Sequence, residues 1–212
     1  MKYFDITPKL SSDTAVFPGD QRLERSVSMD FKKGDHLLLS SIKSTLHIGA
    51  HTDAPNHYNK DGEDIASSDL KPYLGRAQVI EIKKKKNSRI EWSDLVGKKI
   101  LAPRVLFKTS SFPNPNIWNG DFNALSQSLI QELAKAGVTL VGIDTPSVDP
   151  ADDQTLESHR EIYRLGLRIL EGIVLEGVPE GIYTLMALPL PIVGGDASPV
   201  RALLIEKDLG IP

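Results

Sequence analysis

The chain has 212 residues, of which 40% are hydrophobic and 25% charged, which is typical of a globular protein and excludes collagen-like, coiled-coil and disordered chains. Its 25 basic and 28 acidic residues give a net charge of −3, which argues against a nucleic-acid-binding protein because that function needs a basic face. There are no cysteines, so disulfides, thiolate metal ligands and a cysteine nucleophile are excluded.

The length fits one domain over residues 1–212, and no Ser/Gly-rich or Pro-rich linker divides the chain. The first residues lack the apolar core of a secretory signal, since Asp5 and Pro8 interrupt them. No run approaches the roughly 18 apolar residues that span a bilayer. We therefore expect a cytoplasmic protein that acts neither in a membrane nor on nucleic acid.

Predicted strands dominate the pattern of apolar residues along the chain. Residues 77–82 alternate with a period of two, and residues 83–86 are four lysines that suit the solvated tip of a hairpin. Further apolar runs predict strands because many of their residues are β-branched. These runs are residues 105–107, 138–143, 173–175, 183–188 and 200–205.

Two segments are predicted to be helical. In residues 123–136 four apolar side chains share one face, and Gly137 is a suitable stop. Residues 155–165 have apolar side chains at roughly helical spacing, with Thr155 as the expected N-cap. Strands and helices do not alternate regularly, so the pattern indicates an α/β or α+β domain with more strand than helix.

Three of the five histidines lie within residues 47–57, in the order His47, His51 and His57, together with Asp53. All four positions are odd, so an extended chain would point them to one face. On a helix, Asp53 would lie about 200° around from His51. Neutral histidine and carboxylate are metal ligands, and the pattern therefore favours an extended metal-binding loop over chance clustering.

The same loop must also bend. In a straight strand His47 and His51 would lie about 13 Å apart, too far for two ligands of one metal ion. Gly49 gives the backbone freedom for a bend, and Pro55 fixes a second change of direction before His57. His159 lies among apolar neighbours and by itself indicates a hydrogen-bonded core histidine.

The segment 47–57 resembles the signature His-x-Gly-(Thr/Ala)-His-x-Asp-x-Pro-x-His of the metal-dependent cyclase/formamidase family. Four further stretches resemble the bacterial kynurenine formamidase branch of that family. They are residues 17–20, 142–150, 169–172 and 196–201. The order, spacing and total length agree as well, so the resemblance extends from near the start of the chain to about residue 204.

The resemblance implies a swivelling β/β/α-type fold with a mixed sheet, a homodimer and a site for two zinc ions in each subunit, with manganese as an alternative. In that site Asp53 and Glu171 would bridge the metal ions, and His57 would be the catalytic acid/base. The implied metal ligands are His47, His51, Asp53, His159 and Glu171. His159 and Glu171 are about 18 Å apart on a continuous helix, so the helix must end between them, for which Gly166 is suited.

The activity implied by the resemblance is metal-dependent hydrolysis of N-formyl-L-kynurenine to L-kynurenine and formate. A metal-bound hydroxide would attack the formyl carbonyl, and His57 would protonate the arylamine that leaves. Phe17 occupies the place where the branch usually has Trp. Its ring would stack on the aryl ring of the substrate, unless it packs beside Pro18 in the core.

Two alternatives remain beside the formamidase. A related hydrolase could open a cyclic amide, such as an isatin-type lactam, or act on another small amide with the same metal loop. A metal-binding or ligand-binding protein without turnover is disfavoured because all expected ligands and the acid/base histidine are present. The residues 144–150 and the length favour the formamidase.

Overall fold

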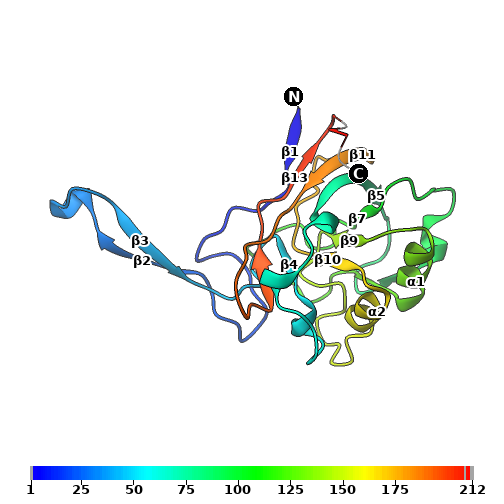
Figure 1. Ribbon diagram of the computed structural model, residues 1–212, viewed down its shortest axis with the longest axis horizontal. Helices are drawn as coiled ribbons and strands as arrows, with labels where there is room; N and C mark the ends of the chain where they lie inside the picture. Colours follow the sequence, from blue (N-terminus) through cyan, green and yellow to red (C-terminus); the bar gives the residue numbers. More distant parts are fainter. Residues whose placement is uncertain (1, 208, 211–212) are drawn as a thin grey trace.

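A seven-stranded mixed sheet forms the centre of the computed structural model, which describes residues 2–207 and 209–210. The order of its strands is β1–β13–β11–β5–β7–β9–β10 (Figure 1). The strands β5, β7, β9 and β10 are parallel, whereas β1, β13 and β11 continue the sheet in antiparallel pairs. The bounds are β1 (Tyr3–Asp5), β5 (Leu74–Glu81), β7 (Arg104–Lys108), β9 (Leu140–Ile143), β10 (Arg168–Leu170), β11 (Gly181–Met186) and β13 (Leu203–Ile205).

Hydrophobic cores lie on both faces of this sheet, because successive side chains of a strand point to opposite sides. Val79 and Leu106 face one core, and their neighbours Ile80 and Phe107 face the other. The second core is covered by α1 (Gln127–Lys135) and α2 (Glu157–Leu165), which contact each other. The structure confirms the α/β class, with a mixed sheet and more strand than helix.

Three two-stranded sheets complete the architecture. One pairs β4 (His51–Asp53) with β12 (Ala197–Pro199), and another pairs β6 (Arg89–Ile90) with β8 (Ala124–Leu125). The third pairs β2 (Glu24–Met29) with β3 (Leu39–Lys43) and projects away from the body as an arm, residues 24–43 (Figure 1). In the described part of the chain, no helix is long and apolar enough to cross a bilayer.

Short 3-10 helices occupy several of the connections. One of them carries His57 at its end and so belongs to the loop singled out in the sequence. Their bounds are Phe31–Lys33, Pro55–His57, Ile65–Ser67, Lys71–Tyr73 and Trp92–Leu95.

Both predicted helices start later than the sequence suggested. The first begins at Gln127 because residues 124–125 form β8, and the Ser126 hydroxyl accepts a hydrogen bond from the Leu129 N–H as the N-cap. It ends before Gly137, as expected, where φ is +83°. The second begins at Glu157, and the prediction of Thr155 as its N-cap is wrong, since Leu156 occupies that position.

Two strand predictions are also wrong. Residues 83–86 are not a hairpin tip: β5 already has β7 and β11 on its two sides, so the chain leaves the sheet and β6 pairs with β8. Residues 173–175 bury Ile173 and Leu175 in the core, yet they form no strand, and Val174 N–H donates one bond to Ile6 O. Their alternating pattern reflects burial without a neighbouring strand to pair with. The other five apolar runs each contain a strand.

Candidate metal centre

The strand β4 places two of the predicted ligands side by side. His51 and Asp53 are two residues apart on it and therefore point to the same side. β12 pairs with one edge of β4. On the other edge, His51 N–H donates to Glu171 O at 3.1 Å, and Glu171 N–H donates to His51 O at 2.9 Å. This short bridge fixes Glu171 next to both ligands.

Glycine permits the close approach of the two loops that carry these residues. Gly49 has φ +59°, and the chain bends there, as the sequence predicted. Gly172 has φ +63°, and a Cβ at this position would lie 2.0 Å from Gly49 O. The bend brings His47 back beside His51, with ring centroids 5.2 Å apart. Pro55 then starts the short helix that ends at His57.

The connection between His159 and Glu171 also meets the requirement set by their spacing. His159 lies in the first turn of α2, which ends at Leu165. Gly166 follows with φ +72° and reverses the chain, and β10 then leads back to Glu171. The two residues thus do not lie on one helix, and the turn brings the side chain of Glu171 back toward that of His159.

Two carboxylates lie between two groups of histidines. Asp53 Oδ1 is 3.0 Å from His47 Nδ1 and 3.6 Å from His51 Nε2, and Asp53 Oδ2 is 3.3 Å from His159 Nε2. Glu171 Oε2 is 3.2 Å from His51 Nε2, whereas its Oε1 is 3.8 Å from His159 Nε2. Each carboxylate thus offers one oxygen to each side, which is the arrangement of a ligand shared by two cations.

Three donor atoms of this cluster lack the hydrogen-bond partners that buried polar groups normally have. Asp53 is 1% exposed and His159 3%. Within the described residues, both carboxylate oxygens of Asp53 and the Nε2 of His51 are buried without a hydrogen-bond partner. Such groups are costly to bury unless something satisfies them, and ions bound by histidine and carboxylate would do so. The residues present therefore fit a metal centre.

The electrostatics of the cluster are those of an anionic site. Burial, which by itself lowers the pKa of a histidine, is outweighed at His47 by Asp53 and Asp196, and its pKa rises to about 9. At His159 burial is likewise outweighed by Asp149 and Asp53, and the pKa rises to about 10. The carboxylates thus attract positive charge into the space between them.

His57 behaves differently from these two histidines. Its side chain is 34% exposed, and burial of the ring is the largest effect on its pKa, which lies below the usual value. The ring is therefore neutral near pH 7 and can accept a proton. Ligand atoms of His57, Asp53 and His159 also lie within 4.8 Å of one another, so His57 stands at the edge of the cluster.

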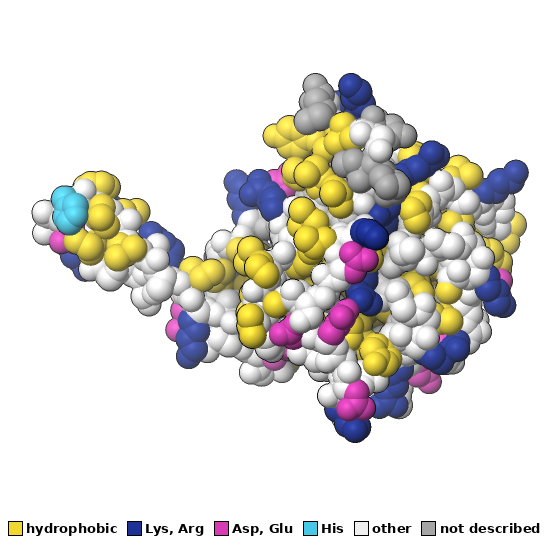
Figure 2. Space-filling view, viewed as in Figure 1, with side chains coloured by type: hydrophobic (Ala, Val, Ile, Leu, Met, Phe, Trp, Pro, Cys, Tyr) yellow, Lys and Arg dark blue, Asp and Glu magenta, His cyan; other side chains and the backbone are white. Residues whose placement is uncertain are grey.

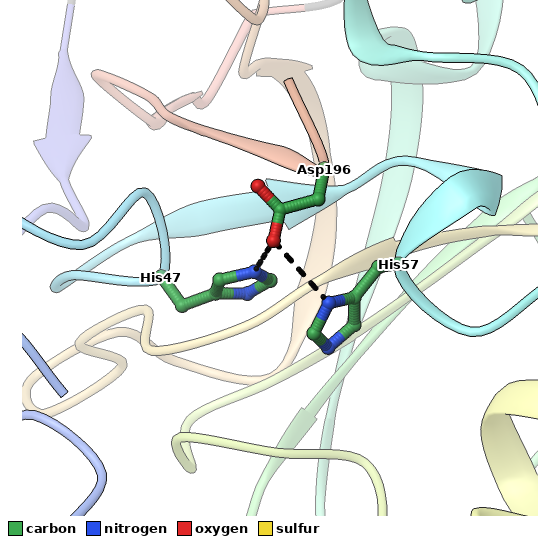
Figure 3. Close-up of side chains that lie close together, drawn as sticks. All are labelled: His47, His57 and Asp196. Atoms are coloured by element: carbon green, nitrogen blue, oxygen red, sulfur yellow. Dashed lines mark hydrogen bonds and ion pairs between the residues drawn. The ribbon is translucent and has the colours of Figure 1, made fainter. Parts of the chain in front are cut away.

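Two aspartates orient the histidines, and the sequence did not reveal this. Asp149 accepts a bond from His159 Nδ1 at 2.7 Å, which directs Nε2 of that ring toward Asp53. Asp196 Oδ2 is 3.0 Å from His47 Nε2 and 3.5 Å from His57 Nδ1, between the two rings (Figure 3). The position of Asp149 in a Pro-rich turn gave no sign of a histidine partner. Asp196 lay in a recognised stretch without an assigned role.

A cavity of about 340 Å³ opens over the cluster and is lined by all six predicted ligand and acid/base residues. Phe17 lines it too, and also lines a second, much smaller cavity of about 30 Å³ beside His47 and His51. The Phe17 ring is half-buried and lies against Trp118, with centroids 4.6 Å apart. The ring thus borders the cavity instead of being sealed in the core.

The chain matches the "Cyclase" family model over residues 4–150 and belongs to that family. It is 41% identical over 204 residues to a kynurenine formamidase of Delftia acidovorans, covering 96% of this chain and 97% of the relative. A kynurenine formamidase of Bordetella pertussis is also 41% identical, over 212 residues, with 97% and 98% covered. Within the Cyclase family, the chain therefore belongs to the kynurenine formamidases.

Solved structures share the fold. One, described as a potential metal-dependent hydrolase with cyclase activity, has a TM-score of 0.82 and 26% identity over 96% of each chain. An isatin hydrolase bound to the product analogue thioisatinate has a TM-score of 0.82, with 96% of this chain and 91% of that chain covered. At 19% identity, the second likeness shows the fold alone.

Proposed function

We propose that this protein hydrolyses N-formyl-L-kynurenine to L-kynurenine and formate in a metal-dependent reaction. The observation that carries the proposal is the pair of buried carboxylates, Asp53 and Glu171, shared between two groups of histidines. The membership of the kynurenine formamidases supports the choice of substrate.

The proposed cofactor is zinc, two ions in each subunit, with manganese as the alternative. A ligand set of histidine and carboxylate without thiolate suits either metal. His47 and His51 would hold one ion and His159 the other, with Asp53 and Glu171 shared. When bound, such ions polarise a carbonyl oxygen and make water a stronger nucleophile at neutral pH.

His57 is the proposed acid/base. The reaction adds water across the formyl C–N bond: hydroxyl goes to the formyl carbon and a proton goes to the arylamine nitrogen. An arylamine is a poor leaving group as an anion, so a proton donor is needed. His57 is neutral before the reaction, can take the proton of the attacking water, and can then give it to the nitrogen. Asp196 faces its Nδ1 and orients the ring.

The aryl ring of the substrate is proposed to stack on Phe17. This side chain borders the cavity over the cluster, and Trp118 supports it from behind. A phenylalanine in place of the usual tryptophan keeps an aromatic face at this point.

The test is reconstitution of the purified protein with zinc and, separately, with manganese, followed by measurement of kynurenine release from N-formyl-L-kynurenine. We expect rapid release that a chelator abolishes and added metal restores. Metal-loaded protein that binds two equivalents of metal and releases no kynurenine would reject the substrate while leaving the metal centre in place.

The alternative function is hydrolysis of a cyclic amide such as isatin. The same cluster of histidines and carboxylates would serve for it, and isatin hydrolases share the fold. Parallel assays on isatin and N-formyl-L-kynurenine separate the two, and we expect the formamide to be hydrolysed with the higher kcat/KM.

A homodimer is the proposed assembly, and the arm supports it. All residues of β3 are exposed, and Phe31 and Ile42, both in the arm, are 65% and 70% exposed. Hydrophobic side chains gather at the far end of the arm (Figure 2). A two-stranded hairpin is marginally stable by itself, and an exposed apolar patch marks an interaction site.

The same chain carries an apolar groove beside the ends of β11 and β13. Its lining includes Leu10, Met186, Leu188, Leu190 and Pro199. An arm and a groove on each subunit can be exchanged symmetrically about a twofold axis, so that each arm covers the partner's groove. We therefore assign the arm to a second copy of this chain.

A further inference from the structure

One side chain over the metal cluster has a backbone conformation that its residue type disfavours. Among the described residues, three that are not glycine have positive φ: Asn87, Ser110 and Leu156. Asparagine tolerates this region, whereas a branched aliphatic side chain does not. Leu156 has φ +52° and ψ +49° and immediately precedes α2.

Charged groups on both sides of Leu156 hold it in place. Before it, Asp153 accepts bonds from the N–H and the hydroxyl of Thr155. After it, Asp149 accepts bonds from the N–H groups of Ser158 and His159. Arg89 binds both carboxylates, at 2.8 Å to Asp149 and 2.6 Å to Asp153. The conformation is therefore fixed by its surroundings.

Neither capping nor core packing explains a leucine at this position. An N-cap is normally Ser, Thr, Asp, Asn or Gly, and the Leu156 side chain makes no capping bond because Asp149 fills that role. The side chain is half-buried and does not belong to either of the two large cores. A leucine here costs backbone strain without a structural gain, and strain of this kind concentrates at functional sites.

Leu156 does line the cavity over the cluster, as Phe17 does. The rest of that lining consists of the histidines and carboxylates, further polar side chains, and small or proline residues. Leu156 and Phe17 are thus its only large apolar side chains among the described residues. We propose that Leu156 is a specificity-determining residue whose side chain contacts the aryl ring of the substrate and selects aryl formamides. This inference rests on the proposed formamidase function.

The test compares Leu156→Gly and Leu156→Asn, which tolerate the conformation but lack the apolar side chain, with Leu156→Met, which keeps an apolar side chain. We expect Leu156→Gly to have an equal or higher Tm and unchanged metal content. It should bind L-kynurenine at least about tenfold more weakly, since loss of an apolar contact in a pocket has that effect. Its inhibition by formate, which has no ring, should stay within about twofold of the wild type. Leu156→Met should retain most of the affinity for L-kynurenine.

Asn87→Gly is the matched control, because it relieves the same conformation at an exposed position outside the cavity. It should not change L-kynurenine binding. Unchanged L-kynurenine binding in Leu156→Gly would overturn the inference, and so would equal weakening for formate and L-kynurenine. A wild-type protein that hydrolyses no N-formyl-L-kynurenine would instead overturn the proposed function and the inference with it.

Discussion

At the scale of single residues, Asp53 is the centre of the site. It is buried, and its two oxygens face different histidines. Burial would raise the pKa of its carboxyl, but His159 and His47 hold it well below the usual range, so the group is an anion near neutral pH. His57, in contrast, lies at the border of the cavity and is partly exposed. The proposed roles in metal ligation and in proton transfer thus fall to different side chains.

This division predicts the outcome of His57→Ala. The variant should keep its full complement of metal and lose about 10²–10⁴-fold in kcat, the usual contribution of general acid–base catalysis. Metal content by elemental analysis and kcat by kynurenine release are the measurements. His36→Ala, which changes an exposed histidine in the arm, is the control and should be fully active. Loss of metal in His57→Ala would place His57 among the ligands instead.

The sequence was informative about these residues for a physical reason. His47, His51, Asp53 and His57 are near one another in the chain, and strand periodicity with a bend at Gly49 is a local property. The orienting bonds of Asp149 and Asp196 join segments far apart in sequence. No local pattern announces such partners, so they became visible only in the structure.

At the scale of elements, α1 and α2 pack through apolar side chains and are also joined by a hydrogen bond. The buried Glu161 carboxylate on α2 binds Arg164 on the same helix and accepts a bond from Gln127 on α1 at 3.3 Å. The bond from Arg164 is the main cause of a pKa lowered to about 2. Because α2 also carries His159, a proposed metal ligand, this contact helps to hold that helix against the body of the protein.

The lowered pKa of Glu161 predicts a dependence of stability on pH. Its contribution is fully present above about pH 4.5, the usual value, and is lost as the pH falls toward about 2. Because Arg164 is largely exposed, we expect only about 1 kcal/mol. Glu161→Gln should lack this part of the acid destabilisation, as measured by urea unfolding with a chelator present. Glu132→Gln on α1 is the control, and equal pH profiles for wild type and Glu161→Gln would contradict the assignment.

Most strands of the main sheet were predictable, whereas two of the short strands were not. The buried strands β5, β7, β9 and β11 follow from runs of apolar residues. β10 and β12 have three residues each, too few for a periodic pattern, and exist because neighbouring segments pair with them. The start of α2 was misplaced for a related reason, since its cap comes from Asp149, seven residues before Leu156.

At the scale of the whole molecule, the arm and the body differ in how far they bury their apolar side chains. The body has two cores and buries its apolar residues, whereas the arm pairs only with itself and exposes several of them (Figures 1 and 2). Nothing in the alternation of residues 24–43 distinguished such a hairpin from a loop. Neither β2 nor β3 has a continuous apolar face, which is the pattern that predicts a strand from sequence.

The proposed exchange of arms predicts the behaviour of a double variant, Phe31→Asp with Ile42→Asp. Removing two apolar side chains from the interface and adding charge should weaken dimerisation about 10²-fold or more. Sedimentation at micromolar concentrations should then give a monomer. Val96→Asp, at an exposed apolar residue outside the arm and the groove, should remain dimeric. A double variant that stays dimeric would exclude the arm as the interface.

The meeting of Asp53 and Glu171 at one cluster also bears on the stability of the folded chain. These residues are more than 100 positions apart, and the chain has no cysteine with which to form a covalent cross-link. A cation held by both would close that long loop as a disulfide does, and closure on this scale restricts the unfolded chain by about 4–5 kcal/mol. Catalysis and the cross-linking of distant parts of the chain would then depend on the same side chains. A substitution of Asp53 or Glu171 that abolishes activity would therefore also lower the stability of the metal-loaded protein.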